Sequence, residues 1–215
     1  WNGGLNFFEN LIFFLKKYKK KVGISIITDN KKNIIINKNF KNIEILETEL
    51  VSNKFNLKKL LDKIFIVIFG KSLFLENFLT SNNIKILSHG TFCGKNSKIK
   101  SFPWFPDFQH IHFPDNFTKK NKFLRNLNVI LSSRHSNNII TSSKSVKKDI
   151  KKISLIAYEK TKVLYHTNRV EEPKNIYDLK YLKKKFSIKK KYFLLPNHYW
   201  IHKNHFVVLK ALNAI

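Results

Sequence analysis

One loop of the chain gathers side chains that could hold a sugar. Residues 101–112 read SFPWFPDFQHIH and are followed by another proline and aspartate. Prolines and aromatic rings stiffen such a loop, so it can present Asp107, Gln109 and His110 at fixed positions. Aromatic rings stack on the C–H face of a sugar while polar groups bond to its hydroxyls. The loop therefore indicates a carbohydrate site, with the competing interpretation that His110 is a structural histidine.

Metal chemistry is weakly supported by the same loop. His110 and His112 are two residues apart and would share one face of an extended stretch. No third ligand accompanies them at metal-binding spacing, so we expect neither a metal ion nor a resident cofactor. Cys93 is the only cysteine of the chain. We expect it to be an ordinary reduced thiol, which fits a cytoplasmic location.

Two other segments have residue types that suit a phosphate. Gly3 and Gly4 precede a predicted helix, where glycines let a ligand approach free backbone amides, although an ordinary tight turn has the same pattern. Residues 195–205 read LPNHYWIHKNH and join a predicted strand to a predicted helix. Lys203 can reach a diphosphate bound at that helix start. In so lysine-rich a chain, a solvated lysine is the competing interpretation.

The elements that must position these segments alternate between strand and helix. We predict strands over residues 22–28, 43–46, 64–69, 84–87, 138–141 and 162–166. We predict helices over residues 6–20, 56–62, 73–79, 118–131 and 143–153, the last capped by serine hydroxyls at its start. Residues 88–117 show no period. The alternation predicts an α/β fold with a parallel sheet between helices, in which ligands bind at the carboxyl ends of the strands.

The chain divides into three parts by composition. We predict a first domain over residues 1–167 and a charged, lysine-rich linker over residues 168–190. Residues 191–215 would open a second domain, with a strand over 192–195 and a helix over 204–214. The chain starts on Trp1, has no methionine and stops inside a predicted helix. We therefore expect it to be a piece of a longer protein, lacking the first strand of its first domain.

The net charge of +27 suggests polyanionic partners. However, only three basic residues are arginines, the lysines are spread along the chain, and Lys, Asn, Ile and Phe are all favoured by AT-rich codons. A clustered basic face rather than bulk charge marks nucleic-acid binding, so we expect no specific nucleic-acid partner. Peripheral contact with anionic lipid fits the charge. No run of about 18 apolar residues is present, so we expect no membrane-spanning helix.

Taken together, these segments resemble the retaining glycosyltransferases of family 4, which have the GT-B fold, and above all their bacterial mannosyltransferase-like subset. The matching segments read WNGG at 1–4, W-x-P-D-x-Q-H at 104–110, IITSSKSVKKD at 139–149 and P-N-x-x-W-x-H-K-N-H at 196–205. The second and fourth are specific, and the likeness covers nearly the whole chain. It implies that both units are Rossmann-like, the first on the acceptor side and the second on the donor side.

The resemblance also implies residue roles. Gly3 and Gly4 would approach the donor phosphates, and His110 would sit beside the transferred sugar. Asp107 and Gln109 would shape the pocket around that sugar.

On the donor side, Lys203 would neutralise the diphosphate leaving group. Many family members place an arginine five residues before this lysine, where this chain has His198, so we expect a weaker phosphate clamp. The family's downstream glutamate pair would lie beyond residue 215, so we expect residues 1–215 alone to be inactive.

The implied activity is transfer of a hexose, with retention, from a nucleotide-sugar donor to a cell-surface glycan or lipid-linked acceptor. The work would take place in the cytoplasm or on the inner face of the cell membrane. The sugar, nucleotide and acceptor stay open, with a lean towards mannose from the resemblance alone. The alternatives are a non-catalytic domain of the same fold and a basic module that binds nucleic acid or glycan.

Overall fold

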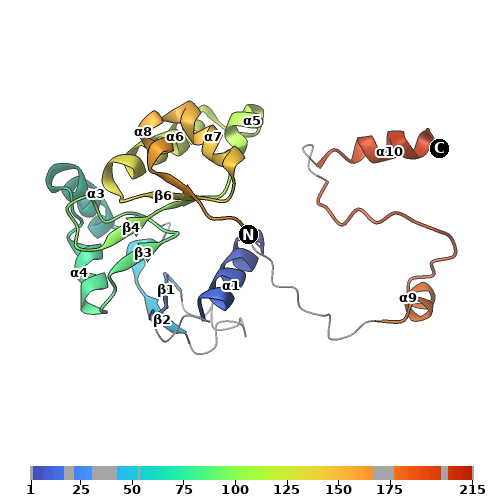
Figure 1. The fold of residues 1–215 in the computed structure, drawn as a ribbon, viewed down its shortest axis with the longest axis horizontal. Helices are drawn as coiled ribbons and strands as arrows, with labels where there is room; N and C mark the ends of the chain where they lie inside the picture. The colour runs from blue at the N-terminus through green and yellow to red at the C-terminus, as the bar shows by residue number, and fades with distance from the viewer. Residues whose placement is uncertain are drawn as a thin grey trace. The chain divides into compact units, whose positions relative to one another are not determined.

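The computed structural model of the chain describes residues 2–16, 22–30, 43–52, 54–166, 177–199 and 203–214. The chain forms two compact units, Trp1–Arg169 and Val170–Ile215. The first unit holds all the described strands and most of the helices (Figure 1). The second holds the helices α9 (Leu179–Lys185) and α10 (His205–Asn213).

The paired strands of the first unit are all parallel. They are β1 (Ser25–Thr28) with β2 (Glu44–Glu47), β3 (Ile86–Ser88) with β4 (Lys100–Phe102), and β5 (Trp104–Phe105) with β6 (Ile139–Thr141) and β7 (Thr161–Val163). Only Pro103 separates β4 from β5, and its carbonyl accepts a 2.8 Å hydrogen bond from the Ile140 amide. The predicted α/β class with parallel strands is therefore confirmed.

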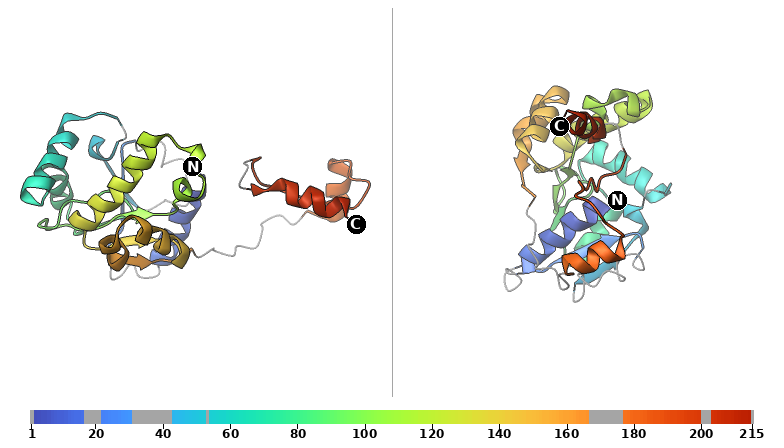
Figure 2. Two further views of the ribbon diagram at one scale, coloured as in Figure 1. Left: turned by 90° about the horizontal axis from the view of Figure 1, so that it is seen from above. Right: turned by 90° about the vertical axis from the view of Figure 1, so that its right-hand side faces the viewer.

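The helices of the first unit begin with α1 (Asn2–Lys16), α3 (Leu57–Phe69), α4 (Phe74–Ser81) and α5 (Gln109–His112). They continue with α6 (Lys119–His135), α7 (Lys144–Ile153) and α8 (Leu155–Lys160), and two short 3-10 turns lie at Glu49–Val51 and Pro114–Asn116. Helices α5 to α8 lie on one side of β6, while α1, β1 and β2 lie on the other (Figure 1). Helix α3 lies at the rim of the unit in Figures 1 and 2.

Two buried clusters hold the first unit together. One joins α4 to β3 and to the loop after it, and consists of Leu75, Leu79, Leu87, Cys93 and Ile99. The other joins β6 to α6, α7 and α8, and consists of Phe108, Val129, Ile139, Ile150 and Ala157. Phe108 belongs to the loop that was singled out by its residue types. Its burial in the second cluster anchors that loop to the helical layer.

Side-chain caps set several helix starts. The Ser143 hydroxyl accepts a 3.1 Å hydrogen bond from the Val146 amide, which confirms the predicted serine cap of α7. Ser154 and Thr118 cap α8 and α6 in the same way. These side chains satisfy amides that have no partner within their own helix.

The predicted buried strand over residues 64–69 is wrong, because these residues form the second half of α3. The Asn56 side chain caps the start of α3, and Gly70 ends it in the left-handed conformation with a φ of 71°. A continuous apolar run fits either a strand buried on both faces or a helix with one wide apolar side. Here Val67 and Ile68 are 66% and 65% exposed, so the two-sided cover that a buried strand requires is missing.

Other expectations fail at loops and in the second unit. Residues 88–117 contain β4, β5 and α5, although they show no period in the sequence. Residues 192–195 form no strand in the described part of the second unit, and α9 lies within the predicted linker. A strand needs a neighbour to pair with, and residues 177–199 and 203–214 supply none. The predicted helix over 204–214 is confirmed as α10.

Among the residues that the structure describes, no single helix is long and apolar enough to cross a membrane. Helices α3 and α4 reach that length and hydropathy only as a pair, and they are bent by 99° relative to each other.

Candidate functional site

Polar and aromatic side chains gather at the carboxyl ends of the parallel strands of the first unit. His89 follows β3, the loop from Pro106 follows β5, Ser142 follows β6, and His166 lies three residues beyond β7. Parallel strands end at a common edge, where α/β proteins place their ligands. This edge is therefore the candidate functional site.

A cluster of rings ties α1 to this edge. Phe7 stacks on Trp104 with ring centres 4.5 Å apart and an angle of 12°. The same Phe7 ring contacts His89 at 5.3 Å and His166 at 4.8 Å. These contacts place the early turns of α1 beside Trp104 of β5 and beside the segments that follow β3 and β7. Sequence reasoning missed Phe7, His89 and His166, although each histidine falls just after or at the end of a predicted strand.

His89 has an unusual backbone and a partly buried ring. Its φ is 63°, its amide donates a 2.9 Å hydrogen bond to the Phe102 carbonyl, and its Nδ1 lies 2.8 Å from the Ser88 hydroxyl. Burial lowers the pKa of His89 to about 4, so the ring is neutral near pH 7. Its Nε2 is buried and has no hydrogen-bond partner among the described residues.

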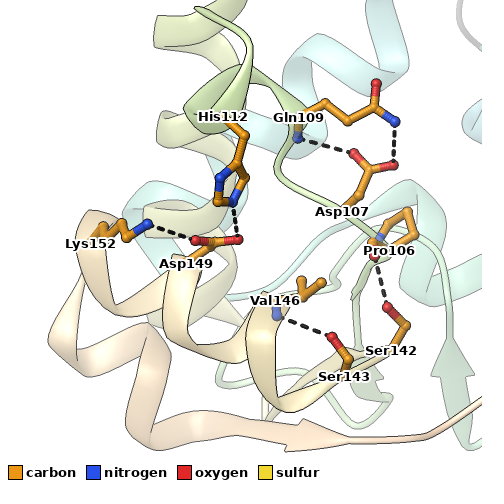
Figure 3. A network of polar contacts seen from close by, with 9 residues as sticks. All are labelled: Pro106, Asp107, Gln109, His112, Ser142, Ser143, Val146, Asp149 and Lys152. Atoms are coloured by element: carbon orange, nitrogen blue, oxygen red, sulfur yellow. Dashed lines mark hydrogen bonds and ion pairs between the residues drawn. The ribbon is translucent and has the colours of Figure 1, made fainter. Parts of the chain in front are cut away.

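The structure brings Asp107 and Gln109 of this loop together. The Gln109 side-chain amide donates to the Asp107 carboxylate at 3.2 Å, and the Gln109 backbone amide does so at 3.4 Å (Figure 3). The Arg125 guanidinium lies 4.0 Å from the same carboxylate. The Ser142 hydroxyl donates a 2.8 Å hydrogen bond to the Pro106 carbonyl, which fastens the loop to the end of β6. Both polar side chains are therefore held in place while still reaching solvent.

His110 lies inside the unit rather than at its surface. Its side chain is only 4% exposed, and its Nε2 lies 2.8 Å from the Asn126 Oδ1 of α6. The oxygen of Asn126 can only accept, so Nε2 carries the proton and Nδ1 is the acceptor nitrogen. Nδ1 is buried and has no partner within the described residues. The loop thus fixes His110, but turns it towards α6.

The expected shared face of His110 and His112 is wrong, because both residues lie in α5 and not in an extended stretch. His112 Nε2 donates to the Asp149 carboxylate of α7 at 2.7 Å, away from Asn126. In the described ranges no three His, Cys, Asp or Glu side chains converge as metal ligands.

Asp149 links the loop to α7 as the acceptor of two hydrogen bonds. His112 and the Lys152 ammonium bond to its two oxygens at 2.7 and 2.9 Å (Figure 3). Burial raises the pKa of Asp149, but the hydrogen bonds and positive charges of His112 and Lys152 outweigh burial and hold it below its usual range. This network holds the α5 turn, and with it His110, against the helical layer.

Asp149→Asn is expected to lower the free energy of unfolding at pH 7 by about 1–3 kcal/mol, because it removes a buried charged acceptor. The folded state depresses the pKa, so this stabilisation is fully present above the unfolded pKa and is lost as the pH falls through the folded pKa. Urea unfolding should therefore show a gap between wild type and variant that closes below about pH 4. A gap of equal size at pH 7 and pH 3 would contradict this account.

Gly3 and Gly4 lie in the first turn of α1 and not before it, so their predicted position is wrong by one turn. Glycine is a poor helix former in a helix interior, so the sequence predicted that the helix begins after Gly4. In a first turn the amides have no intrahelical partner anyway, so glycine costs less there. The ring contacts of Phe7 bring this turn to the carboxyl edge, where its free amides can face an anion.

Lys203 and His198 belong to the second unit. Both are exposed, and Lys203 lies two residues before the start of α10. Asn204, with a φ of 50°, forms the corner between Lys203 and the helix. That Lys203 neutralises a diphosphate leaving group stays a prediction.

No known family model, curated protein or solved structure matches the chain. The resemblance to family 4 glycosyltransferases therefore rests on the four quoted sequence segments alone. What the fold and the edge define together is a class: an α/β protein with parallel strands and a polar and aromatic site at their carboxyl ends.

Proposed function

We propose that the protein is a retaining glycosyltransferase that moves a hexose from a nucleotide-sugar donor to a cell-surface glycan or lipid-linked acceptor. The observation that carries this proposal is the gathering of the 104–110 loop, the glycine turn of α1 and the Ser142 end of β6 at one carboxyl edge. Parallel α/β folds bind their ligands at this edge. The first unit would then be Rossmann-like and would face the acceptor.

The loop supplies groups of the kind that read sugar hydroxyls. Asp107 accepts hydrogen bonds and Gln109 both donates and accepts, and their mutual contact keeps them oriented before substrate arrives. His110 contributes Nδ1 as an acceptor, because Asn126 engages the opposite nitrogen. A substrate that opens the α5 turn would meet a ring whose orientation is already set by Asn126.

Lys203 would act on the leaving group. When the bond between the sugar carbon and the phosphate oxygen breaks, its electron pair leaves with the diphosphate and negative charge builds there. A fixed cation stabilises that charge more in the transition state than in the ground state. His198 would add a hydrogen bond, and the amides of the glycine turn in α1 would approach the same phosphates.

The partners of this reaction are the nucleotide-sugar and the acceptor glycan or lipid, and the reaction as proposed uses no metal ion. Mannose is the sugar that we favour. The proposed place of work is the cytoplasmic face of the membrane, where lipid-linked acceptors are accessible.

His110→Gln tests the proposal in the full-length protein. Glutamine can still donate to Asn126 but lacks the Nδ1 acceptor, so we expect kcat to fall about 10- to 100-fold, the size of one lost buried hydrogen bond. Release of nucleoside diphosphate from a panel of nucleotide-sugars measures the effect. Asp115→Asn is the matched control, because Asp115 is exposed in the neighbouring 3-10 turn and lies outside the His112–Asp149 network. Its activity should stay close to wild type. Equal losses in both variants, or no turnover of any donor by the wild type, would contradict the proposal.

A further inference from the structure

Helix α3 turns an apolar face away from the unit to which it belongs. Six residues at helical spacing form this face, which we call the outer stripe: Leu57, Leu60, Leu61, Ile64, Val67 and Ile68. All six are between 36% and 66% exposed. The opposite face contains Asp62 and Ile66, both 6% exposed. A surface helix normally buries its apolar side against the core of its own domain. An apolar side that faces solvent instead indicates a surface for interaction.

The orientation of α3 is fixed by bonds to α4. The Asp62 carboxylate accepts hydrogen bonds from the amides of Leu73, Phe74 and Leu75 at 2.6, 2.8 and 2.9 Å. These amides open α4, where a carboxylate is stabilised by the free donors. Rolling α3 to hide the outer stripe would break all three bonds. The stripe is therefore held outward by the fold itself.

Positive charge borders the outer stripe. Residues 54–71 carry five lysines and a single acidic residue, Asp62. Asp62 lies on the buried face, so it does not offset the lysines at the surface. At helical spacing, Lys58 and Lys63 fall on the two flanks of the stripe. The outward face of α3 is thus an apolar band between cations.

A groove extends the apolar surface at the start of α3. It has a volume of about 670 Å³ and is lined mainly by Leu50, Phe55, Leu57, Lys58, Phe74 and Phe78. Phe55 is 85% exposed, the second most exposed of the large apolar side chains in the described ranges. Glu49 also lines the groove, and its carboxylate accepts a 3.2 Å hydrogen bond from Asn56. Leu57 belongs to both the groove and the outer stripe, so the two surfaces meet at the start of α3.

We propose that the outer stripe docks the protein onto an anionic lipid surface, with α3 lying in the plane of the interface. Lysines beside an apolar band are the pattern of interfacial helices, because the band enters the acyl boundary while the cations meet anionic head groups. At 13 residues, α3 is about 20 Å long and falls short of the roughly 30 Å hydrocarbon core. The inference does not depend on glycosyl transfer.

A second copy of the chain is a poorer occupant. Two outer stripes face to face would bring Lys58 and Lys63 of one copy towards the same lysines of the other. Like charges placed opposite each other oppose association. The net charge of +27 adds repulsion at longer range.

A fluorophore that reports its environment can follow one position at a time. Cys93 is fully buried and burial raises its pKa to about 12, so a single exposed cysteine can be labelled selectively. We expect the label on Val67→Cys to shift to the blue with vesicles of phosphatidylcholine and phosphatidylglycerol. The label on Ile156→Cys in α8, a position of similar exposure, should not shift. Equal shifts at both positions, or none at either, would overturn the proposal.

Vesicle co-sedimentation separates the outer stripe from bulk charge. We expect the pair Val67→Gln and Ile68→Gln to weaken binding by about tenfold or more. The matched pair Leu155→Gln and Ile156→Gln on α8 should leave it unchanged. Removing phosphatidylglycerol from the vesicles should weaken their binding of the wild-type protein. Equal vesicle binding by the two double variants would mean that bulk charge alone binds the protein to the vesicles. Self-association through Val67 in the absence of vesicles would assign the stripe to a second copy of the chain. Either result would overturn the proposal.

Discussion

Lys203→Ala in the full-length protein is expected to lower kcat for sugar transfer by about 100- to 1,000-fold, as the loss of one preorganised charge-stabilising group does in other enzymes. Negative charge on the diphosphate grows as the sugar departs, so the lysine acts mainly in the transition state. The KM for the donor should change far less than kcat. Because Lys203 is exposed and precedes α10, its removal should leave the fold intact.

Steady-state release of nucleoside diphosphate, with donor concentration varied, gives kcat and KM separately. Lys210→Ala is the matched control, because Lys210 is also exposed but lies within α10 rather than before its start. It should keep wild-type kinetics. If both variants lose the same activity, the effect belongs to general charge and the proposed role of Lys203 is wrong.

Periodicity and capping were enough to predict the layered part of the fold. The β-branched run at residues 22–28 contains β1, and the strand predicted at 138–141 contains β6. Ser143 begins α7 because its hydroxyl satisfies an amide that the helix leaves free. These features depend on residues close together in the sequence, so they can be read from it.

The second half of α3 could not be predicted in this way. Six consecutive apolar residues fit a strand and a helix equally well by pattern. What decides is Asn56 at one end, Gly70 at the other, and the bonds from Asp62 to the start of α4. The bonds from Asp62 join residues that are 11 to 13 positions apart. They depend on how α3 packs against α4, and the periodicity of the sequence does not report that packing.

The candidate site likewise combines local features, which the sequence can predict, with contacts that depend on tertiary packing. Residue types in the loop indicated Asp107, Gln109 and His110 as polar groups held at fixed positions, and the bond between Asp107 and Gln109 spans only two residues. The burial of His110 against Asn126 depends on how α5 packs on α6, 16 residues later. The ring contacts of Phe7 join residues from opposite ends of the first unit. No local pattern could have revealed them.

Gly94→Ala is expected to destabilise the first unit by about 3–5 kcal/mol, through backbone strain and overpacking together. Gly94 has a φ of 103°, which side chains other than glycine rarely adopt. A methyl group here would lie 2.5 Å from the Gly70 carbonyl carbon and 2.8 Å from the Lys71 Cα, and nearer still to the Gly70 oxygen. All three atoms are backbone, so no side chain can swing aside.

To relieve this clash, the loop after β3 would have to move away from the turn between α3 and α4, to which it is hydrogen-bonded. The Gly70 carbonyl accepts a 2.8 Å hydrogen bond from the Asn96 amide, and the Cys93 carbonyl accepts a 2.7 Å bond from the Ser72 amide. Both bonds join the loop after β3 to the turn between α3 and α4. Moving the loop away should break them and open the cluster that buries Cys93.

Two measurements test the expected effects of Gly94→Ala. Urea unfolding monitored by circular dichroism gives the loss of stability, and the labelling rate of the Cys93 thiol reports local opening, since this side chain is 0% exposed in the native fold. Gly90→Ala is the control from the same loop, because its nearest neighbour would be the Leu87 side chain at 4.0 Å and its φ is not positive. It should change stability by less than about 1 kcal/mol. Unchanged thiol protection in Gly94→Ala would show that the loop can shift without opening the cluster, and that Gly94 does not hold α3 and α4 to β3.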